Sequence, residues 1–373
     1  MSHCFFLFGT LRHRPLLERV LGGPADTCAA TLPGHAVMRA AGQSFPILVA
    51  DPGATADGVL LRTDDAGAAR LRLYEEGYEY ALRDVRVQTA AGPVAAQVFA
   101  ADDSPLQAEA PWSLDVWAAR YAPATVEAVD EVLDLARNFT PAVQQARYPM
   151  VLVRADSALR ARANPAPATL RRTPQAEDLC VDTLRRPYAW FFGVEEADLR
   201  FRRFDGGLSP RVTRAGFVVG DAVTVLPYDP VTDRVMLVEQ YRFGPHLRGD
   251  PNPWSLEPIA GRIDPGEDPE TAARRESTEE AGLTLRQLCP VARCYPSPGA
   301  VTEYIFMYVG LADLSAADEG VGGAEAEAED IRAHVIGFDR LMALVSSGEA
   351  ENGPLLATAF WLALHRAELR ANT

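Results

Sequence analysis

Cysteine, long apolar runs and positive charge are all scarce in this sequence. The five cysteines are odd in number and none of them forms a Cys-x-x-Cys pair, which disfavours structural zinc and a disulfide framework and favours a reducing cytoplasm. No apolar run reaches the roughly eighteen residues that a membrane-spanning helix needs. The apolar start, Met1–Phe8, lacks both a basic segment and a small-residue cleavage site, so we expect a buried strand there rather than a signal peptide.

The charge balance is acidic. The chain has 36 basic residues against 51 acidic ones and a net charge of −15, which disfavours a nucleic-acid partner because phosphate backbones bind clustered basic side chains. A small phosphorylated substrate stays compatible with this charge, since a divalent metal screens carboxylates from a diphosphate. With 373 residues the chain exceeds one ordinary core, so we expect two domains.

The pattern of apolar residues divides the chain into three segments. Residues 1–122 read as short strands between Gly and Pro turns, which indicates a small β-rich domain. Residues 123–172 have helical spacing and end in an exposed stretch of Asn, Pro and Ala, so we expect a helical linker. Residues 173–373 return to strands and helices and form the second domain.

Individual elements follow from the spacing of apolar residues and from turn residues. The expected strands are His3–Phe8, Val59–Arg62, Ala81–Thr89 and Val94–Ala100 (the last two joined through Gly92-Pro93), then Phe217–Val219, Ala222–Leu226, Val235–Glu239, Tyr304–Val309 and His334–Phe338. The expected helices are Thr125–Arg162, Pro269–Ala281 and Leu355–Leu369.

One expected helix of the second domain presents acidic residues on a single face. Glu276, Glu279 and Glu280 stand at i, i+3 and i+4, and no lysine is interspersed among them. Like charges so placed repel, whereas hard oxygen ligands on one face suit Mg²⁺ or Mn²⁺. An isolated Glu-x-x-Glu-Glu is more often an acidic surface helix. Pro269 suits the first turn of a helix and Gly282 its C-terminal cap, and Gly261 and Gly266 let the preceding loop bring backbone carbonyls close to a cation.

The residues around this helix resemble the Nudix box. Gly261, Glu267, Arg275, Glu276, Glu279, Glu280 and Gly282 all match its spacing, and Ser277 departs from it at a usually aliphatic position that faces the packing side. The resemblance implies that Glu276, Glu280 and the carbonyl of Ala260 bind metal. It also implies that Glu279 supports or shares that role, and that Glu267 and Arg275 fix the loop and the helix. Such metals polarise a diphosphate and lower the pKa of the attacking water.

The flanks of the box resemble the ADP-ribose pyrophosphatase subfamily from about Tyr188 onward. The matching residues are Phe204-Asp-Gly-Gly, Leu226-Pro-Tyr-Asp-Pro230, Glu239-Gln-Tyr-Arg242, Trp254-Ser-Leu-Glu257, Glu329-Asp-Ile-Arg332 and Pro298. The resemblance implies that Phe191 stacks on adenine and that Arg214 and Arg242 contact the phosphates and terminal ribose. It places Glu303 near the metal and the ribose. Taken singly, Phe191 is equally compatible with a core aromatic residue. For Pro298 an ordinary turn proline is the less favoured alternative.

The same subfamily places a general base in an acidic loop. The resemblance implies Glu327, three residues before Asp330, as that base. Because glutamates alternate with alanines here, the register is open by two residues, and Glu325 and Glu329 are the alternatives.

The start of the chain resembles the gamma-glutamylcyclotransferase-like fold, a small β-barrel. Leu7-Phe8-Gly9-Thr10-Leu11-Arg12 and Leu73–Tyr80 carry the resemblance. It implies that the Gly9–Leu11 turn presents N–H groups to a carboxylate and that Glu75 is a general acid and base, with Glu76 as the alternative. Arg72 departs from the usual Asp, so a retained fold that serves dimerisation or effector binding is an alternative to catalysis. The domain order resembles tellurite-resistance proteins of the TrgB type.

Together these observations predict an α/β (α+β) chain with an N-terminal gamma-glutamylcyclotransferase-like β-barrel domain and a C-terminal Nudix α/β/α sandwich. The expected reaction is hydrolysis of ADP-ribose to AMP and ribose 5-phosphate with Mg²⁺ or Mn²⁺, in a cytoplasmic homodimer. The alternatives are another diphosphate such as a sugar nucleotide or NADH, a gamma-glutamyl cyclotransferase with a passive Nudix half, and a non-catalytic nucleotide sensor. Neither nucleic acid nor a membrane is expected as a partner.

Overall fold

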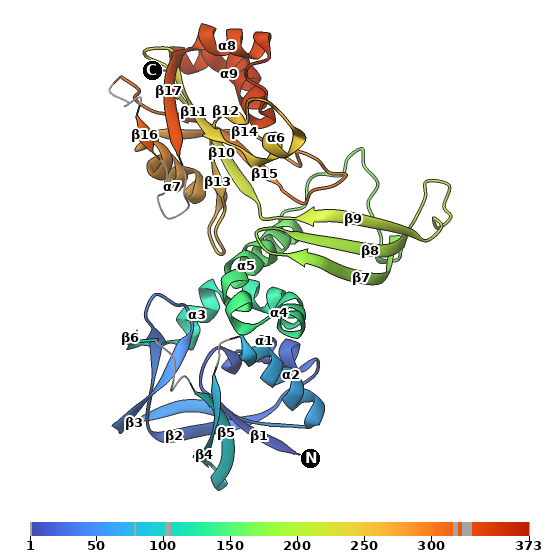
Figure 1. Cartoon of the computed structure of the whole chain (residues 1–373), viewed down its shortest axis with the longest axis vertical. Coiled ribbons are helices and arrows are strands. Elements are labelled where there is room, and N and C mark those ends of the chain that lie inside the picture. Colours follow the sequence, from blue (N-terminus) through green and yellow to red (C-terminus); the bar gives the residue numbers. More distant parts are fainter. Residues whose placement is uncertain (1, 78–79, 101–105, 316–319, 323–329, 373) are drawn as a thin grey trace. The chain divides into compact units, whose positions relative to one another are not determined.

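The computed structural model describes residues 2–77, 80–100, 106–315, 320–322 and 330–372. The chain separates into two compact units, one of residues 1–173 with 189–191 and one of residues 174–188 with 192–373 (Figure 1). In these ranges no helix is both long enough and apolar enough to cross a membrane. The domain boundaries after residues 122 and 172 stay predictions.

The first unit contains a closed barrel. Its strands are β1 (His3–Leu7), β2 (Asp26–Ala40), β3 (Pro46–Thr63), β4 (Ala81–Thr89) and β5 (Gly92–Ala100), with β6 (Ala108–Pro111) paired to β2. They run in the order β3-β1-β5-β4-β2, and β2 pairs back onto β3, which closes the barrel. Inward-facing residues such as Phe6, Leu60 and Val98 fill it and are almost completely buried. The predicted β-barrel is confirmed.

Helices cover the barrel and share a second core with it. They are the short helix η1 (Thr10–Arg12), α1 (Arg14–Leu21), α2 (Asp65–Glu76), α3 (Leu114–Arg120), α4 (Ala122–Asn138) and α5 (Pro141–Ala163). Leu71 and Tyr74 of α2 pack in one cluster with Val129 and Leu133 of α4. Helix α4 therefore belongs to the apolar core of the first unit.

Two local expectations for the first unit are wrong. The hairpin between β4 and β5 does not turn at Gly92-Pro93, because Thr89 pairs with Gly92 and the turn lies at Ala90-Ala91. Gly92 instead begins β5 with a φ of 107°, a conformation that glycine adopts without strain. The expectation of short strands alone also missed α2, which begins where the Asp64 carboxylate accepts a hydrogen bond from the Gly67 N–H at 2.8 Å.

The second unit is built on a mixed sheet. The strands are β10 (Ala222–Asp229), β11 (Arg234–Tyr241), β12 (Trp254–Glu257), β13 (Ile259–Arg262), β14 (Gln287–Cys294), β15 (Ile305–Leu311), β16 (Val321–Gly322) and β17 (Ile331–Gly337). They pair in the order β14-β15-β10-β11-β17-β16, with β12 on β11 and β13 on β10. A separate sheet holds β7 (Leu179–Ala189), β8 (Gly193–Phe201) and β9 (Val212–Val218), preceded by the short helix η2 (Ala176–Asp178).

Helices cover both faces of the mixed sheet. Ala272 and Ala273 of α7 (Pro269–Ala281) pack on one face with Val223 and Val225. Helices α8 (Phe338–Ser347) and α9 (Gly353–Ala371) pack on the other face, around Leu226. Helix α6 (Phe243–Arg248) follows β11. This layering confirms the predicted α/β/α sandwich, and α7 has the predicted bounds. Phe338 was expected to end a strand and instead begins α8.

Candidate active sites

Helix α7 is held in a fixed register by caps at both ends. The Asp268 carboxylate accepts hydrogen bonds from the N–H groups of Glu270 and Thr271 at 3.0 and 3.1 Å. At the other end Gly282 adopts a φ of 61°, and its N–H donates to the Thr278 carbonyl at 3.0 Å. These caps set which residues of the helix face strand β13.

Two glutamates of α7 converge on the backbone of β13. A Cβ atom on Gly261 would lie 1.9 Å from the carboxyl carbon of Glu276, so glycine leaves room for that carboxylate in its present position. The Ala260 N–H donates to Oε2 of Glu280 in a long contact of 3.4 Å, and Glu280 is 7% exposed. The structure therefore brings Glu276, Glu280 and Ala260 together, as the sequence predicts.

Arg275 organises the rest of the box. Its Nε and Nη2 donate to Glu267 at 3.1 and 3.0 Å, and Nη2 also donates to the Arg262 carbonyl at 3.0 Å. This confirms the expected pairing that fixes the loop to the helix. The hydrogen bonds to Glu267 raise the pKa of Arg275 further above its ordinary value, so the guanidinium is a permanent charge.

The same arginine also pairs with two of the three glutamates that were expected on one face of α7. Its Nη1 donates to Glu276 at 2.7 Å and to Glu279 at 3.0 Å, and the Glu279 side chain is 55% exposed. Across the described ranges, no three acidic, His or Cys side chains are grouped so that they could hold a metal ion. Glu279 lies three residues after Glu276 and one residue before Glu280. The negative charge crowded at these three positions attracts the Arg275 guanidinium.

The residues present nonetheless fit a hard divalent cation. Glu276 and Glu280 supply carboxylate oxygens at a mostly buried position, and Ala260 has a carbonyl in the strand that they face. An all-oxygen donor set of this kind is what Mg²⁺ takes in proteins. The assignment of these residues as ligands stays a prediction.

A cleft of about 800 Å³ opens beside Ala260 and is large enough for a nucleotide-sized ligand. Thr224, Arg242, Glu257 and Glu303 line it together with Ala260. Arg242 donates to Glu257 through Nε at 3.0 Å and Nη2 at 2.7 Å, and Glu257 is 4% exposed. Such a two-pronged pair fixes the plane of the guanidinium.

Glu303 lies in a desolvated part of this cleft. Burial raises the pKa of the Glu303 carboxyl, while the positive charge of Arg242 opposes that shift and Asp221 adds to it. The structure thus places Arg242 and Glu303 in one electrostatic environment, and their roles toward the substrate stay predictions.

The described residues that line this cleft do not include the other expected residues. Arg214 is exposed on β9 and donates through Nη1 to the Thr213 carbonyl at 3.0 Å. Pro298 is exposed in a turn in which the Ala300 N–H donates to the Ser297 carbonyl at 3.0 Å. Phe191 groups with the first unit and is 55% exposed. Glu327, with its alternatives Glu325 and Glu329, lies outside the described residues.

Sequence reasoning missed two cleft residues. Thr224 is buried, and its Oγ1 has no hydrogen-bond partner in the part of the chain that the structure describes. The sequence signal for Thr224 was its hydroxyl group within the otherwise apolar run Val223-Thr-Val-Leu226, because a buried polar group needs a hydrogen-bond partner. The role of Glu257 in holding Arg242 could not be read from the motif that contains it.

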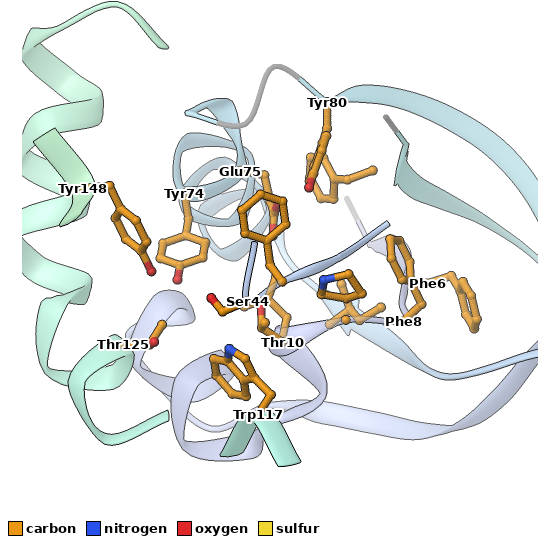
Figure 2. Close-up of a pocket in the computed structure, with 16 residues that line it drawn as sticks. Phe6, Phe8, Thr10, Ser44, Tyr74, Glu75, Tyr80, Trp117, Thr125 and Tyr148 are labelled. Carbon is orange, nitrogen blue, oxygen red and sulfur yellow. The ribbon is translucent and has the colours of Figure 1, made fainter. Parts of the chain in front are cut away.

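The first unit has its own pocket, partly open to solvent and about 60 Å³ in volume (Figure 2). Glu75, Tyr74, Tyr80 and Trp117 line it, and the Gly9–Leu11 turn contributes to the wall. Burial raises the pKa of Glu75 to about 8. Glu76 is exposed and does not line the pocket, so the structure favours Glu75 of the two candidates. The pocket is too small for a nucleotide and suits a compact ligand.

Comparisons with known proteins identify a domain family in each unit. Residues 219–358 match the NUDIX domain, and residues 5–119 match the family described as gamma-glutamyl cyclotransferase, AIG2-like. The chain belongs to the Nudix family, as a pyrophosphohydrolase with an AIG2-like domain before its Nudix domain. Nudix hydrolases generally depend on a divalent metal.

Particular relatives match the second half of the chain. The ADP-ribose pyrophosphatase of Escherichia coli strain K12 is 38% identical over 183 residues, which cover 49% of this chain and 87% of the relative. The ADP-ribose pyrophosphatase of Haemophilus influenzae is 38% identical over 185 residues, covering 49% and 85%. The GDP-mannose pyrophosphatase of Enterobacter sp. strain 638 is 30% identical over 137 residues, covering 37% and 70%.

Proposed function

We propose that the second unit hydrolyses the diphosphate of ADP-ribose to AMP and ribose 5-phosphate with Mg²⁺ or Mn²⁺. The observation that carries the proposal is the convergence of Glu276 and Glu280 on Ala260, at the edge of the cleft that Arg242 and Glu303 line. The 38% identity to two ADP-ribose pyrophosphatases supports this substrate over GDP-mannose, whose pyrophosphatase is 30% identical over a shorter stretch.

Each residue has a proposed role in that reaction. Glu276, Glu280 and the Ala260 carbonyl hold the cation, with Glu279 in support; a bound divalent cation polarises a diphosphate and lowers the pKa of water. Arg242, held by Glu257, contacts the phosphates. Glu303 orients the terminal ribose. The remaining proposals are Glu327 as the proton acceptor, Phe191 and Arg214 as contacts to the nucleotide, and Pro298 as part of the substrate loop.

A substrate panel tests the proposal. We expect AMP release from ADP-ribose to exceed product release from GDP-mannose and NADH, with Glu280→Gln as the inactive control. A tenfold faster rate with GDP-mannose or NADH contradicts the substrate assignment and leaves the hydrolase assignment standing.

A second candidate function is gamma-glutamyl cyclotransfer in the first unit, favoured by Glu75 and the Gly9–Leu11 turn, which line the same pocket. In this reaction the substrate's α-amine attacks its own γ-carbonyl carbon and a C–N bond forms. The Glu75 carboxylate accepts the proton from that amine and returns it to the leaving amine as the old amide C–N bond breaks. The products are 5-oxoproline and a free amine.

Release of 5-oxoproline from a gamma-glutamyl amide tests this second function. We expect release by the wild type, loss in Glu75→Gln and retention in Glu76→Gln, since Glu76 is exposed. Absence of release by the wild type excludes cyclotransfer and favours a binding role for the pocket.

We also propose a cytoplasmic homodimer. Exposed apolar residues of β7, namely Leu179, Val181 and Leu184, support association, because solvent-exposed apolar groups gain free energy when a partner covers them.

A further inference from the structure

Two residues from helices α4 and α5 line the pocket of the first unit. Thr125 of α4 and Tyr148 of α5 are part of its wall (Figure 2). Both helices lie beyond residues 5–119, the stretch that matches the AIG2-like family. The pocket is therefore completed by residues outside the matched stretch and not by the matched barrel alone.

Helix α5 is tied to the helix end that carries Glu75. Nε2 of Gln145 donates to the Gly77 carbonyl at 2.8 Å, two residues after Glu75. Gln144 packs so closely on Gly77 that a Cβ there would lie 2.7 Å from its Oε1, and its Nε2 donates to the Phe139 carbonyl at 2.9 Å. Gln144 is 6% exposed, so this contact is buried. These contacts hold α5 in place as part of the pocket wall, so this helix is more than a linker.

The wall that these helices supply is polar but uncharged. Figure 2 shows the hydroxyl groups of Tyr74, Thr125 and Tyr148 directed toward the same region, with Ser44 beside them. Oγ1 of Thr125 donates to the Tyr121 carbonyl at 2.8 Å, which leaves its lone pairs free to accept from a ligand. Among the described residues that line the pocket, Glu75 is the one carboxylate and there is no Arg, Lys or His.

We propose that Thr125 and Tyr148 are specificity-determining residues, which select substrates whose leaving amine carries a neutral hydrogen-bonding group. This inference rests on the proposed cyclotransfer at Glu75. In that reaction the Gly9–Leu11 turn faces the substrate carboxylate and Glu75 faces the reacting nitrogens, so the hydroxyl-lined region receives the rest of the leaving amine. Among the described pocket residues, a carboxylate on that amine meets no positive charge, and an ammonium meets only Glu75, the group that must exchange the proton, so either charge is poorly matched.

Three gamma-glutamyl amides of similar size test the proposal. The leaving amines are ethanolamine, which is neutral, glycine, which adds a carboxylate, and ethylenediamine, which adds an ammonium. We expect kcat/KM for 5-oxoproline release to be roughly tenfold higher for the ethanolamine derivative, the effect of about one well-placed hydrogen bond.

Conservative variants identify the residues responsible. Tyr148→Phe and Thr125→Val each remove one hydroxyl and should raise KM for the ethanolamine derivative, with little change in kcat, so that the preference shrinks. Tyr121→Phe is the matched control, because Tyr121 does not line the pocket. Thermal unfolding of each variant shows whether the fold is kept, and Thr125→Val gives an independent measurement if Tyr148→Phe fails to fold.

The possible outcomes separate the two proposals. Preference for the neutral amine that both variants reduce supports the inference. An active wild type that prefers a charged amine, or variants that match Tyr121→Phe, overturns the inference and leaves cyclotransfer standing. A wild type that releases no 5-oxoproline from any of the three amides overturns both.

Discussion

Gly261 and the carboxylate of Glu276 are in direct contact, since a Cβ on Gly261 would lie 1.9 Å from the carboxyl carbon. Gly261→Ala must therefore displace Glu276, and we expect a loss of AMP release on the order of 100-fold, the size of effect that a misplacement of about 1 Å causes. Gly337→Ala is the matched control, because nothing lies within 4 Å of the added Cβ. Equal activity of the two variants would show that Glu276 does not need this position.

Glu257 is expected to act on the reaction through Arg242. Removing its charge in Glu257→Gln leaves the guanidinium without its two-pronged partner, so Arg242 loses its fixed orientation in the cleft. We expect a fall in kcat/KM for ADP-ribose of roughly tenfold or more. Steady-state kinetics checks this, with thermal unfolding to separate misorientation from loss of fold. Unchanged kinetics in a folded variant contradicts the positioning role.

The stability of the first unit is expected to depend on pH through Glu75. Its pKa is raised from 4.5 to about 8 in the folded chain by burial, so the unfolded chain releases this proton at lower pH than the folded chain. The wild type should thus lose stability as pH rises from about 4.5 to about 8, and no more above that range.

Urea unfolding of the wild type and Glu75→Gln at pH 5 and pH 8 measures this effect. The variant lacks the ionisation, so its stability relative to the wild type should be greater at the higher pH. A stability difference that is the same at both pH values contradicts the raised pKa of Glu75.

Association through β7 can be tested by mass. The wild type is expected to have twice the chain mass of 40.5 kDa in light scattering after size exclusion. Val181→Asp places a charge among the exposed apolar residues of β7 and should shift the protein toward the monomer. A monomeric wild type rules the dimer out.

The sequence predicted the Nudix helix well because its boundaries depend on local chemistry. Asp268, Pro269 and Gly282 determine where α7 begins and ends, and its period places Glu276 and Glu280 on one face. Ser277 was also expected on the packing side, and it is fully buried, with its Oγ donating to the Ala273 carbonyl at 2.7 Å. These features involve residues within a few positions of one another.

Features that depend on distant contacts could not be predicted. The residue spacing allows the Arg275 side chain to pair with several different carboxylates. In the structure it lies between Glu276 and Glu279 and donates to both. The segment expected as a linker contributes Tyr148 to a pocket whose barrel strands lie far away in sequence, and helical periodicity carries no information about such a partner.

The most direct test of the metal-dependent hydrolase is the rate of AMP release from ADP-ribose by Glu276→Gln and Glu280→Gln, measured with Mg²⁺ and with a chelator. Glutamine keeps the shape of the side chain and removes its charge. Turnover is expected to fall by about two orders of magnitude or more in each variant. The wild type is expected to lose activity in the chelator, and Glu270→Gln, an exposed substitution on the same helix, to stay near normal. Near-normal turnover in Glu276→Gln, or full wild-type activity in the chelator, would contradict the account.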